Sequence, residues 1–428
     1  MSAKRSDLEI LNIIHRNGIR LSLGAFKTSR KWSLYVEANE LPLFFRREEL
    51  AMRYALKIKA NRDNPVYDSI YKLPYKHLYE HSNFKSFGET VNSLFRDSGI
   101  NHSKIMPRHI PNYPPWLSEP NDVSFELSMY DKKTTLSDVF RAKFSEILPI
   151  YSDYQQFYTD GSKQDHKASY GFYCDLGSMS SRISNNSSIF TAETEAIRRV
   201  LKYIDTSTRS NKKYVIFTDS RSVLESIYNQ DSRNPLILET LDKIEQLKEA
   251  GNIIKFCWVP SHVGIRGNEV ADRRAREALT ENEPVHYKFP HTDYKSVIRM
   301  FIHDKWQNHW DFKNTERSNK LYKIIPKIKP YSITNLKRRE EVIIHRLRIG
   351  HTRLTHRYLM EDPLKREPIC NYCYLEQLSI NHIFTECQHF ERIRSRHFRV
   401  NDMKQLFEKV PYKHIFNFLK QSKLYDEI

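Results

Sequence analysis

The sequence lacks the apolar segments of a membrane or secreted protein. No run of apolar residues is long enough to span a bilayer. The N-terminal segment, MSAKRSDLEI, has no apolar core of the kind found in signal peptides. Internal repeats and low-complexity tracts are also absent. At 428 residues with 39% hydrophobic residues, the chain is expected to be soluble and intracellular, in the nucleus or cytoplasm, with roughly two or three domains.

Cysteine is scarce, with only five residues in the chain. Cys174 and Cys257 lie within expected strands, where a free thiol is usually a small buried apolar group. A disulfide framework is not expected in a reducing compartment. The remaining three cysteines cluster near the C-terminus, and this clustering indicates metal binding.

The C-terminal cluster has the pattern Cys370-x2-Cys373-x8-His382-x4-Cys387. Three thiolates and one imidazole are typical of a closed, tetrahedral structural Zn²⁺ site. The gap between the second cysteine and the histidine is longer than in a retroviral zinc knuckle. His389 is an alternative ligand, and three free thiols beside an unrelated histidine are the alternative to a metal site.

The net charge of +17 is unevenly distributed along the chain. Residues 1–150 carry +6, residues 151–283 carry −1, and residues 284–428 carry +12. A near-neutral centre between basic ends suits an active site built from carboxylates, flanked by segments that bind a polyanion. Nucleic acid is therefore the expected partner, and no membrane is expected.

Five segments are expected from the pattern along the chain. Residues 1–60 have helical periodicity, and 61–150 form a connector whose first part, 61–118, is expected to be poor in regular structure. Residues 151–283 alternate strands with helices, 284–345 form a basic helical linker, and 346–428 form the Cys/His tail.

The central segment is predicted to be a mixed α/β domain. Strands are expected at 156–159, 169–174, 214–218 and 253–259, with another between the second and the first helix. Helices are expected at 191–204, 220–228 and 235–250, and a last one begins with Asn268 as its cap. This order predicts helices packed on a sheet.

Four acids in this segment lie in separate short motifs. Asp160 is expected to end a strand at the Gly-Ser turn of YTDGS, and Asp219 follows a strand in FTDS. Glu193 of TAETEAI and Asp272 of GNEVAD are expected in early helical turns. Ligands gather at the carboxyl ends of strands, so these side chains can converge there. Singly, each motif is more typical of a turn, a helix cap or a solvated face.

Four converging carboxylates repel one another, and divalent cations relieve that repulsion. Carboxylate oxygens favour Mg²⁺ or Mn²⁺ over softer metals. A pair of such ions activates water and stabilises the leaving 3′-oxygen of a phosphodiester. His262, in WVPSH, is the fifth member expected at this site.

The stretch 156–280 resembles a type 1 ribonuclease H domain. The blocks TDGS, AETEAI, FTDS and WVPSHVGIRGNEVADRRA match that family in order. The resemblance implies an RNase H-like mixed sheet, and it places the metal-binding acids at Asp160, Glu193, Asp219 and Asp272. It also implies that His262 assists product release and proton transfer.

Two further acids, Glu195 and Glu269, lie close in the sequence to the expected metal ligands and must be distinguished from them. Glu195 is a rival for Glu193, but the family pattern Glu-x-x-Ala-Ile fits only the register of Glu193. Glu269 is expected to lie beside the site in a supporting role. The long basic insertion of some cellular ribonucleases H is not evident within 220–251, so the flanking segments are expected to hold the substrate.

The wider chain resembles the C-terminal part of a jockey-type non-LTR retrotransposon polyprotein. GAFKTS at 24–29, YVEANELPL at 35–43, RLRIGHTRLTH at 346–356 and the Cys/His cluster carry this resemblance. It implies that 1–60 is a thumb-like remnant of a reverse transcriptase. Because the chain has no Asp-Asp pair, polymerase activity is not expected.

The sequence therefore predicts an endoribonuclease that cuts the RNA strand of RNA·DNA hybrids and leaves 5′-phosphate ends. Two Mg²⁺ or Mn²⁺ ions and one structural Zn²⁺ are the expected cofactors. The alternatives are a non-catalytic nucleic-acid-binding protein and a DNA-cutting member of the same fold.

Overall fold

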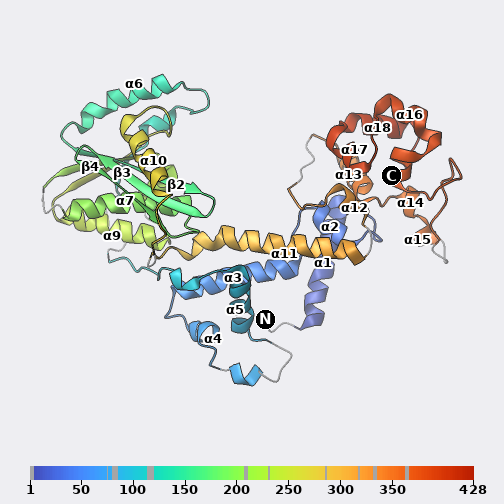
Figure 1. Ribbon diagram of the computed structural model, residues 1–428, viewed down its shortest axis with the longest axis horizontal. Coiled ribbons are helices and arrows are strands. Elements are labelled where there is room, and N and C mark those ends of the chain that lie inside the picture. Colours follow the sequence, from blue (N-terminus) through green and yellow to red (C-terminus); the bar gives the residue numbers. More distant parts are fainter. Residues whose placement is uncertain are drawn as a thin grey trace. The chain divides into compact units, whose positions relative to one another are not determined.

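The computed structural model describes residues 4–74, 76–79, 85–112, 120–206, 211–229, 232–284, 287–316, 319–330, 335–361 and 366–428. The chain divides into two compact units (Figure 1). The first, the sheet unit, is Leu50–Arg299, and the second, the helical unit, combines Met1–Glu49 with Met300–Ile428. The boundaries fall inside helices α3 (Leu43–Ala60) and α11 (Tyr294–Glu316).

A six-stranded mixed sheet forms the centre of the sheet unit, in the order β1-β6-β5-β2-β3-β4. The strands are β1 (Asp122–Ser124), β2 (Gln155–Gln164), β3 (Lys167–Cys174), β4 (Gly177–Ile183), β5 (Lys213–Thr218) and β6 (Ile253–Trp258). β1, β6, β5 and β2 are parallel, whereas β2, β3 and β4 form an antiparallel meander. This sheet with packed helices confirms the predicted fold class.

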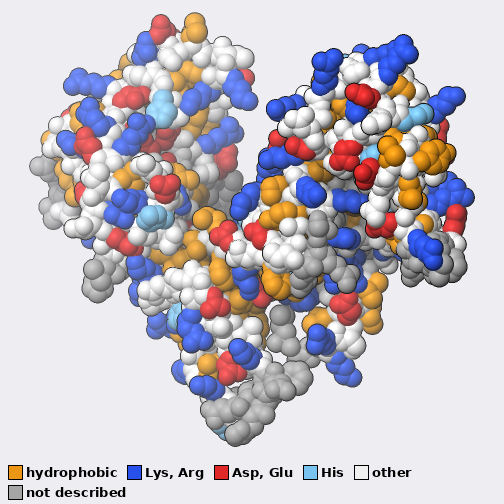
Figure 2. Space-filling model, turned by 45° about the vertical axis from the view of Figure 1, so that its right-hand side comes forward, with side chains coloured by type: hydrophobic (Ala, Val, Ile, Leu, Met, Phe, Trp, Pro, Cys, Tyr) orange, Lys and Arg blue, Asp and Glu red, His pale blue; other side chains and the backbone are white. Residues whose placement is uncertain are grey.

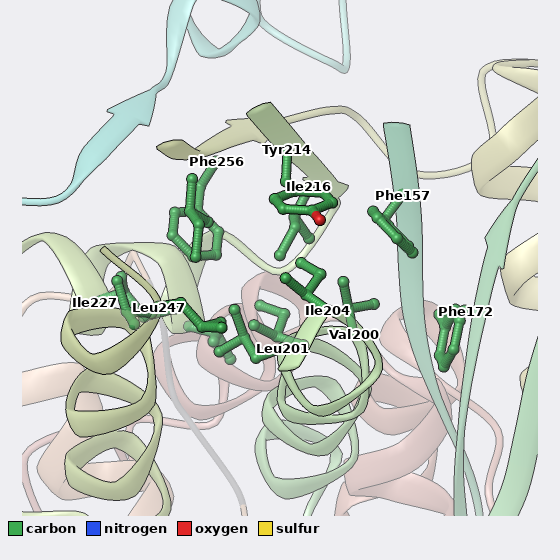
Figure 3. Close-up of a cluster of buried hydrophobic side chains, with 14 of the residues drawn as sticks. Phe157, Phe172, Val200, Leu201, Ile204, Tyr214, Ile216, Ile227, Leu247 and Phe256 are labelled. Carbon is green, nitrogen blue, oxygen red and sulfur yellow. The ribbon is translucent and has the colours of Figure 1, made fainter. Parts of the chain in front are cut away.

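One face of the sheet is covered by α7 (Ile189–Thr206), α8 (Arg221–Asn229) and α9 (Pro235–Glu249). Their apolar side chains meet those of the strands in one buried cluster (Figure 3). Val200, Leu201 and Ile204 recur at helical spacing on α7 and lie against Phe157 and Ile216 of the strands. Each such side chain contributes about 1.5–3 kcal/mol when fully buried. This core fixes the start of α7 relative to β2 and β5.

The other face carries α10 (Arg266–Ala278) and α6 (Ser137–Ile147). A Cβ added to Gly171 of β3 would lie 2.7 Å from both Ala271 O and Ala275 N, so only glycine lets α10 cross so close. Phe144 of α6 packs edge-to-face on Phe217 of β5, with ring centroids 5.3 Å apart.

The prediction of little regular structure over 61–118 was wrong, because α4 (Tyr67–Tyr71) and α5 (Phe87–Ser98) lie within it, and the rest of the connector adds β1 and α6. β1 adds a sixth strand by pairing with β6, and α6 buries Phe140 and Phe144 against the sheet. The prolines that suggested a stiff linker lie between α5 and β1, at Pro107 and Pro111 and in residues outside the described part.

The helical unit holds the two ends of the chain together through buried polar contacts. Residues 1–60 are mostly helical, as expected, in α1 (Arg5–Leu23), α2 (Lys31–Glu37) and α3. Arg348 of α13 (Arg338–Ile349) donates from Nε to Glu37 of α2 at 2.8 Å, and His345 approaches the same carboxylate at 2.8 Å. Figure 2 shows many Lys and Arg side chains on the visible face of this unit.

The remaining helices of this unit are α12 (Lys320–Ile324), α14 (Arg353–His356), α15 (Tyr358–Glu361), α16 (Glu391–His397), α17 (Met403–Lys409) and α18 (Tyr412–Gln421). They enclose a buried aromatic group that includes Phe384, Phe390 and Phe418. Throughout the described residues, no helix combines the length and the apolar character needed to cross a membrane.

Candidate active site

Asp160 and Asp219 lie side by side where two parallel strands separate. Asp160 was expected to end its strand, but β2 runs on to Gln164 because it pairs with β3, placing Asp160 opposite Gly171. The parallel pairing of β2 with β5 does end at Thr159 and Thr218. Both aspartates therefore follow the last pair of the parallel part, which agrees with the convergence predicted there.

Glu193 reaches this edge because α7 crosses very close to β2. A Cβ added to Gly161 would lie 2.7 Å from the backbone nitrogen of Glu193 and 3.0 Å from the Cβ of Ala192. Glycine at this position therefore allows the helix to approach. One carboxylate oxygen from each of Asp160, Glu193 and Asp219 lies within 4.8 Å of the others.

Burial and mutual repulsion favour the protonated form of these acids. Burial raises the pKa of Asp160 to about 8, and the charges of Asp219 and Asp272 add to this shift. Burial, followed by the charges of Asp160 and Asp219, holds the pKa of Glu193 well above its usual range. Burial also raises the pKa of Asp219.

One carboxylate oxygen of this group also lacks a hydrogen bond. Glu193 Oε2 is buried and has no hydrogen-bond partner among the described residues. A divalent cation would supply both the missing positive charge and the missing contact. Because all the donors are hard carboxylate oxygens, the site fits Mg²⁺ or Mn²⁺.

A second group adjoins the first and is formed by His262, Glu269 and Asp272, with ligand atoms within 4.8 Å of one another. His262 Nδ1 lies 3.5 Å from Asp272 Oδ2, and Arg276 Nη2 lies 2.6 Å from the same oxygen. The charge of Asp272 acts on both Asp160 and Asp219, so the two groups are neighbours. The structure thus brings the five predicted side chains to one edge of the sheet.

The His262 side chain differs from the acids in being open to solvent, with 58% of its surface exposed. Its backbone is left-handed, with φ of 57°, which is uncommon for a residue other than glycine. An exposed imidazole at the rim of a buried carboxylate group can exchange protons with solvent and contact a substrate.

Asn268 is a site residue that sequence reasoning assigned to another role. It was expected to cap the last helix, but α10 begins earlier, at Arg266, after Ile265. Asn268 is buried in the first turn, and hydrogen bonding from its side chain lowers the pKa of Asp219, partly offsetting the effect of burial. Its position four residues before Asp272 is the signal that could have found it, because this spacing shares a helix face.

Glu195 takes no part in the carboxylate group. Its buried carboxylate accepts hydrogen bonds from Arg198 Nη1 and Arg199 Nε, both at 2.6 Å. Of the two rivals for the second acid, the structure therefore brings Glu193 to Asp160. Glu269 lies beside the site and accepts a hydrogen bond from the Gly264 nitrogen at 3.2 Å.

The four members of the Cys/His cluster come together in the helical unit, with one ligand atom from each within 4.8 Å of the rest. Cys373 Sγ lies 3.2 Å from His382 Nε2, and Cys370 Sγ lies 3.9 Å from Cys387 Sγ. Zinc bonds of about 2.0–2.3 Å place tetrahedral donors about 3.5–3.8 Å apart, so the arrangement fits Zn²⁺. The His389 ring instead packs on Tyr372, with centroids 5.4 Å apart.

Backbone hydrogen bonds favour a thiolate in this cluster. The Leu375 backbone, with that of Glu376, lowers the pKa of Cys373 to about 6. Burial raises the pKa of Cys387 to about 11. The loop is tightened by hydrogen bonds from Cys370 N to Glu376 O and from Tyr374 N to Cys370 O, each 2.8 Å long. A preformed loop with one thiolate is suited to capture a thiophilic cation.

The RNase H family model matches residues 153–280. This segment, which is similar to RNase H, contains the four acids and five of the six strands described above. Among curated proteins, the Gag-Pol polyprotein of bovine immunodeficiency virus (strain R29) is 28% identical over 233 residues. This alignment covers 52% of the chain but only 14% of that polyprotein, so the chain corresponds to a small part of its length.

Three solved structures illustrate the similarity. They are RNase H1 from Halobacterium salinarum NRC-1, LC11-RNase H1 in complex with an RNA/DNA hybrid, and the N-terminal RNase H domain of rv2228c from Mycobacterium tuberculosis. Each is 20% identical and covers 29% of this chain, with a TM-score of 0.25. The matches cover 96%, 99% and 94% of those chains, respectively.

Proposed function

We propose that this protein is an endoribonuclease that hydrolyses the RNA strand of RNA·DNA hybrids. The observation that carries this proposal is the meeting of Asp160, Glu193 and Asp219 within the segment matched by the RNase H family. With Asp272 next to them, these carboxylates would hold two Mg²⁺ or Mn²⁺ ions. Bound ions would activate a water and stabilise the leaving 3′-oxygen of the phosphodiester.

The residues around the proposed ion sites would have different roles in the reaction. Asp160 and Glu193, both buried, fix the ligand oxygens on rigid elements and keep bulk water from them. A hydrogen bond from Asn268 favours the ionised form of Asp219 and so partly offsets the effect of burial. His262, exposed beside Asp272, can carry a proton between the reacting groups and solvent. The products would carry 5′-phosphate and 3′-hydroxyl ends.

The wider chain is proposed to derive from the C-terminal part of a jockey-type retrotransposon polyprotein. The partial similarity to a retroviral Gag-Pol polyprotein supports a retroelement origin. Residues 1–60 would then be a reverse transcriptase remnant without polymerase activity. Residues 346–428 would form a tail stabilised by one structural Zn²⁺ bound to Cys370, Cys373, His382 and Cys387.

The test is cleavage of a hybrid labelled separately on its RNA and DNA strands. Purified full-length protein, loaded with zinc, would be assayed with and without Mg²⁺, omitting chelators so that the Cys/His cluster is undisturbed. The expected result is Mg²⁺-dependent loss of the RNA strand with 5′-phosphate products, abolished by Asp219→Asn. Duplex DNA and single-stranded RNA should remain intact.

Two results would point to the alternatives. Cleavage of duplex DNA under the same conditions would indicate a DNA-cutting enzyme of this fold. Binding of the hybrid without cleavage, whichever divalent cation is added, would indicate a non-catalytic nucleic-acid-binding protein. Either result would overturn the proposal.

A further inference from the structure

A pocket of about 330 Å³ lies wholly within the helical unit, far along the chain from the RNase H domain. Its walls come from α12, the end of α13, the start of α17 and the loop 377–381, which leads into His382 of the Cys/His cluster. Its apolar lining includes Ile324, Leu347, Leu378, Ile380 and Met403. This is a largely preformed recess of the size that accepts a small flat group.

Flat aromatic side chains border this recess. His356 and Tyr358 line it, and their rings are nearly parallel, at 29°, with centroids 6.1 Å apart. Behind them His351 stacks on His356 at 3.8 Å. Burial lowers the pKa of His351 to about 4 and that of His356 to about 3, so both imidazoles are neutral at physiological pH. A stack of uncharged rings offers a platform for a nucleobase.

Three lysines, Lys320, Lys323 and Lys404, also line the pocket. Within the described ranges none of them forms a salt bridge with an acid. The aliphatic stem of Lys320 packs against Gly350, which has φ of 70°. A Cβ added to this glycine would lie 2.7 Å from Lys320 Cδ, so a larger residue would displace the lysine stem. Burial lowers the pKa of Lys320, a cost that a bound anion would offset.

The acids at the pocket do not neutralise this set. Asp402 accepts a hydrogen bond from Gln405 N at 2.8 Å as the cap of α17. Glu367 acts on Lys320 from a distance, favouring its charged form. Arg348, also at the pocket, is committed to Glu37. The pocket therefore combines an apolar floor, an aromatic edge and a surplus of positive charge.

We propose that this pocket binds one nucleotide unit of a single-stranded nucleic acid. The base would stack on the Tyr358–His356 edge above the apolar floor, and the flanking phosphates would contact Lys320, Lys323 and Lys404. A strand rather than a peptide fits, because a flat base and an adjacent anion match both parts of the lining. The site is separate from the carboxylate site, and its occupancy does not require cleavage.

The test uses full-length protein carrying Asp219→Asn, so that no strand is cut, loaded with zinc and free of Mg²⁺. Binding of labelled ten-nucleotide single strands, RNA and DNA in separate arms, would be followed by fluorescence anisotropy. Lys404→Glu is compared with Lys409→Glu, since both lysines are exposed on α17 and only Lys404 lines the pocket. Thermal unfolding of the two variants confirms that both fold.

Lys404→Glu should weaken binding by about tenfold and reduce the slope of log affinity against log salt by about one. Lys409→Glu should change affinity by less than about twofold. Tyr358→Ala should weaken binding by about tenfold, as loss of one stacked base does. Photo-crosslinks from iodouracil-substituted strands should map to peptides around Tyr358.

Equal effects of Lys404→Glu and Lys409→Glu, or crosslinks confined to residues 153–280, would overturn the proposal. Failure of both labelled strands to bind the protein would overturn it as well. Lys404-dependent binding in the RNA arm, the DNA arm or both supports the pocket, and the tighter arm identifies the strand it takes.

Discussion

Arg141 donates a hydrogen bond from Nη1 to the carbonyl oxygen of Val263, at 3.3 Å. On the other side of His262, Lys132 Nζ donates to Ser261 Oγ at 2.5 Å. Both donors belong to the segment before residue 153, where the RNase H match begins. The added helix α6 and the turn before it thus hold both neighbours of His262. Such support matters because a non-glycine residue in a left-handed conformation is strained.

Arg141→Ala should therefore slow cleavage by loosening the His262 loop. We expect kcat to fall by roughly 3- to 30-fold with little change in KM, since misplacement of a catalytic group by a fraction of an ångström has effects of this order. Single-turnover cleavage of a hybrid measures this. Lys143→Ala on the same helix is the control, because its side chain pairs with the exposed Glu146, at 2.7 Å, and not with the His262 loop.

A positioning role can be separated from general destabilisation by a double-mutant cycle. In a His262→Ala background, Arg141→Ala should have almost no further effect on kcat. A loss of equal size in both backgrounds would mean that Arg141 acts independently of His262.

Glu193→Gln and Glu195→Gln should have opposite effects, although they lie two residues apart on α7. Glu193 is buried among other acids, so its neutralisation should abolish cleavage, by at least about 100-fold, and stabilise the Mg²⁺-free protein by about 1 kcal/mol. Glu195 pairs with Arg198 and Arg199, so Glu195→Gln should retain kcat and lower stability by about 1–3 kcal/mol.

Cleavage rates and urea unfolding of the two variants provide the measurement. If Glu195→Gln abolished cleavage while Glu193→Gln cut normally, the assignment of the second acid would be reversed. The same experiment tests the register of Glu193 that the family pattern Glu-x-x-Ala-Ile favours over that of Glu195.

The convergence of the acids was predictable because each acid sits beside its own strand or helix signal. The general rule that ligands gather at the carboxyl ends of parallel strands was enough to predict this. It applies to Asp219, which follows a buried strand, and to Glu193, which lies on a sheet-facing helix. The start of α10 was not predictable, because the helix begins at Arg266 after Ile265, and neither is a typical capping residue. Tertiary contacts, such as the close approach of Gly267 to the ring of Tyr158, set that boundary.

The continuation of β2 past Asp160 and the addition of β1 were missed for a related reason. β1 has only three residues, and its partner β6 lies more than a hundred residues later in the chain. A short edge strand has no periodicity to detect, and its pairing depends on a sheet formed by distant segments. By contrast, Phe140, Phe144 and Ile147 of α6 did carry a helical pattern.

Zinc content should distinguish the ligands of the Cys/His cluster from their neighbours. Purified protein should contain about one zinc per chain. Cys373→Ser and His382→Ala should lose it and show a lower Tm, because the ligand loop packs over the apolar interior of the helical unit. His389→Ala should keep its zinc, since that ring contacts Tyr372. Retention of zinc by Cys373→Ser together with its loss from His389→Ala would require a different ligand set.

Acid should destabilise the helical unit through its buried imidazoles. Burial lowers the pKa of His351 to about 4, against about 6.5 in the unfolded chain. Between these values the unfolded chain binds more protons, so the free energy of unfolding falls as the pH falls through this window. The full effect would be about 3 kcal/mol for His351 alone.

His351→Gln should remove this dependence while retaining a partner for Thr28 Oγ1, which lies 2.6 Å from His351 Nε2. Urea unfolding at steps from pH 8 to pH 4.5 should show a shallower loss of stability for the variant below pH 6.5. Above pH 7 the two curves should run parallel, because the imidazole is neutral in both the folded and the unfolded chain. Identical slopes below pH 6.5 would mean that His351 is protonated without cost, as it would be if the stack with His356 opened before the unit unfolded.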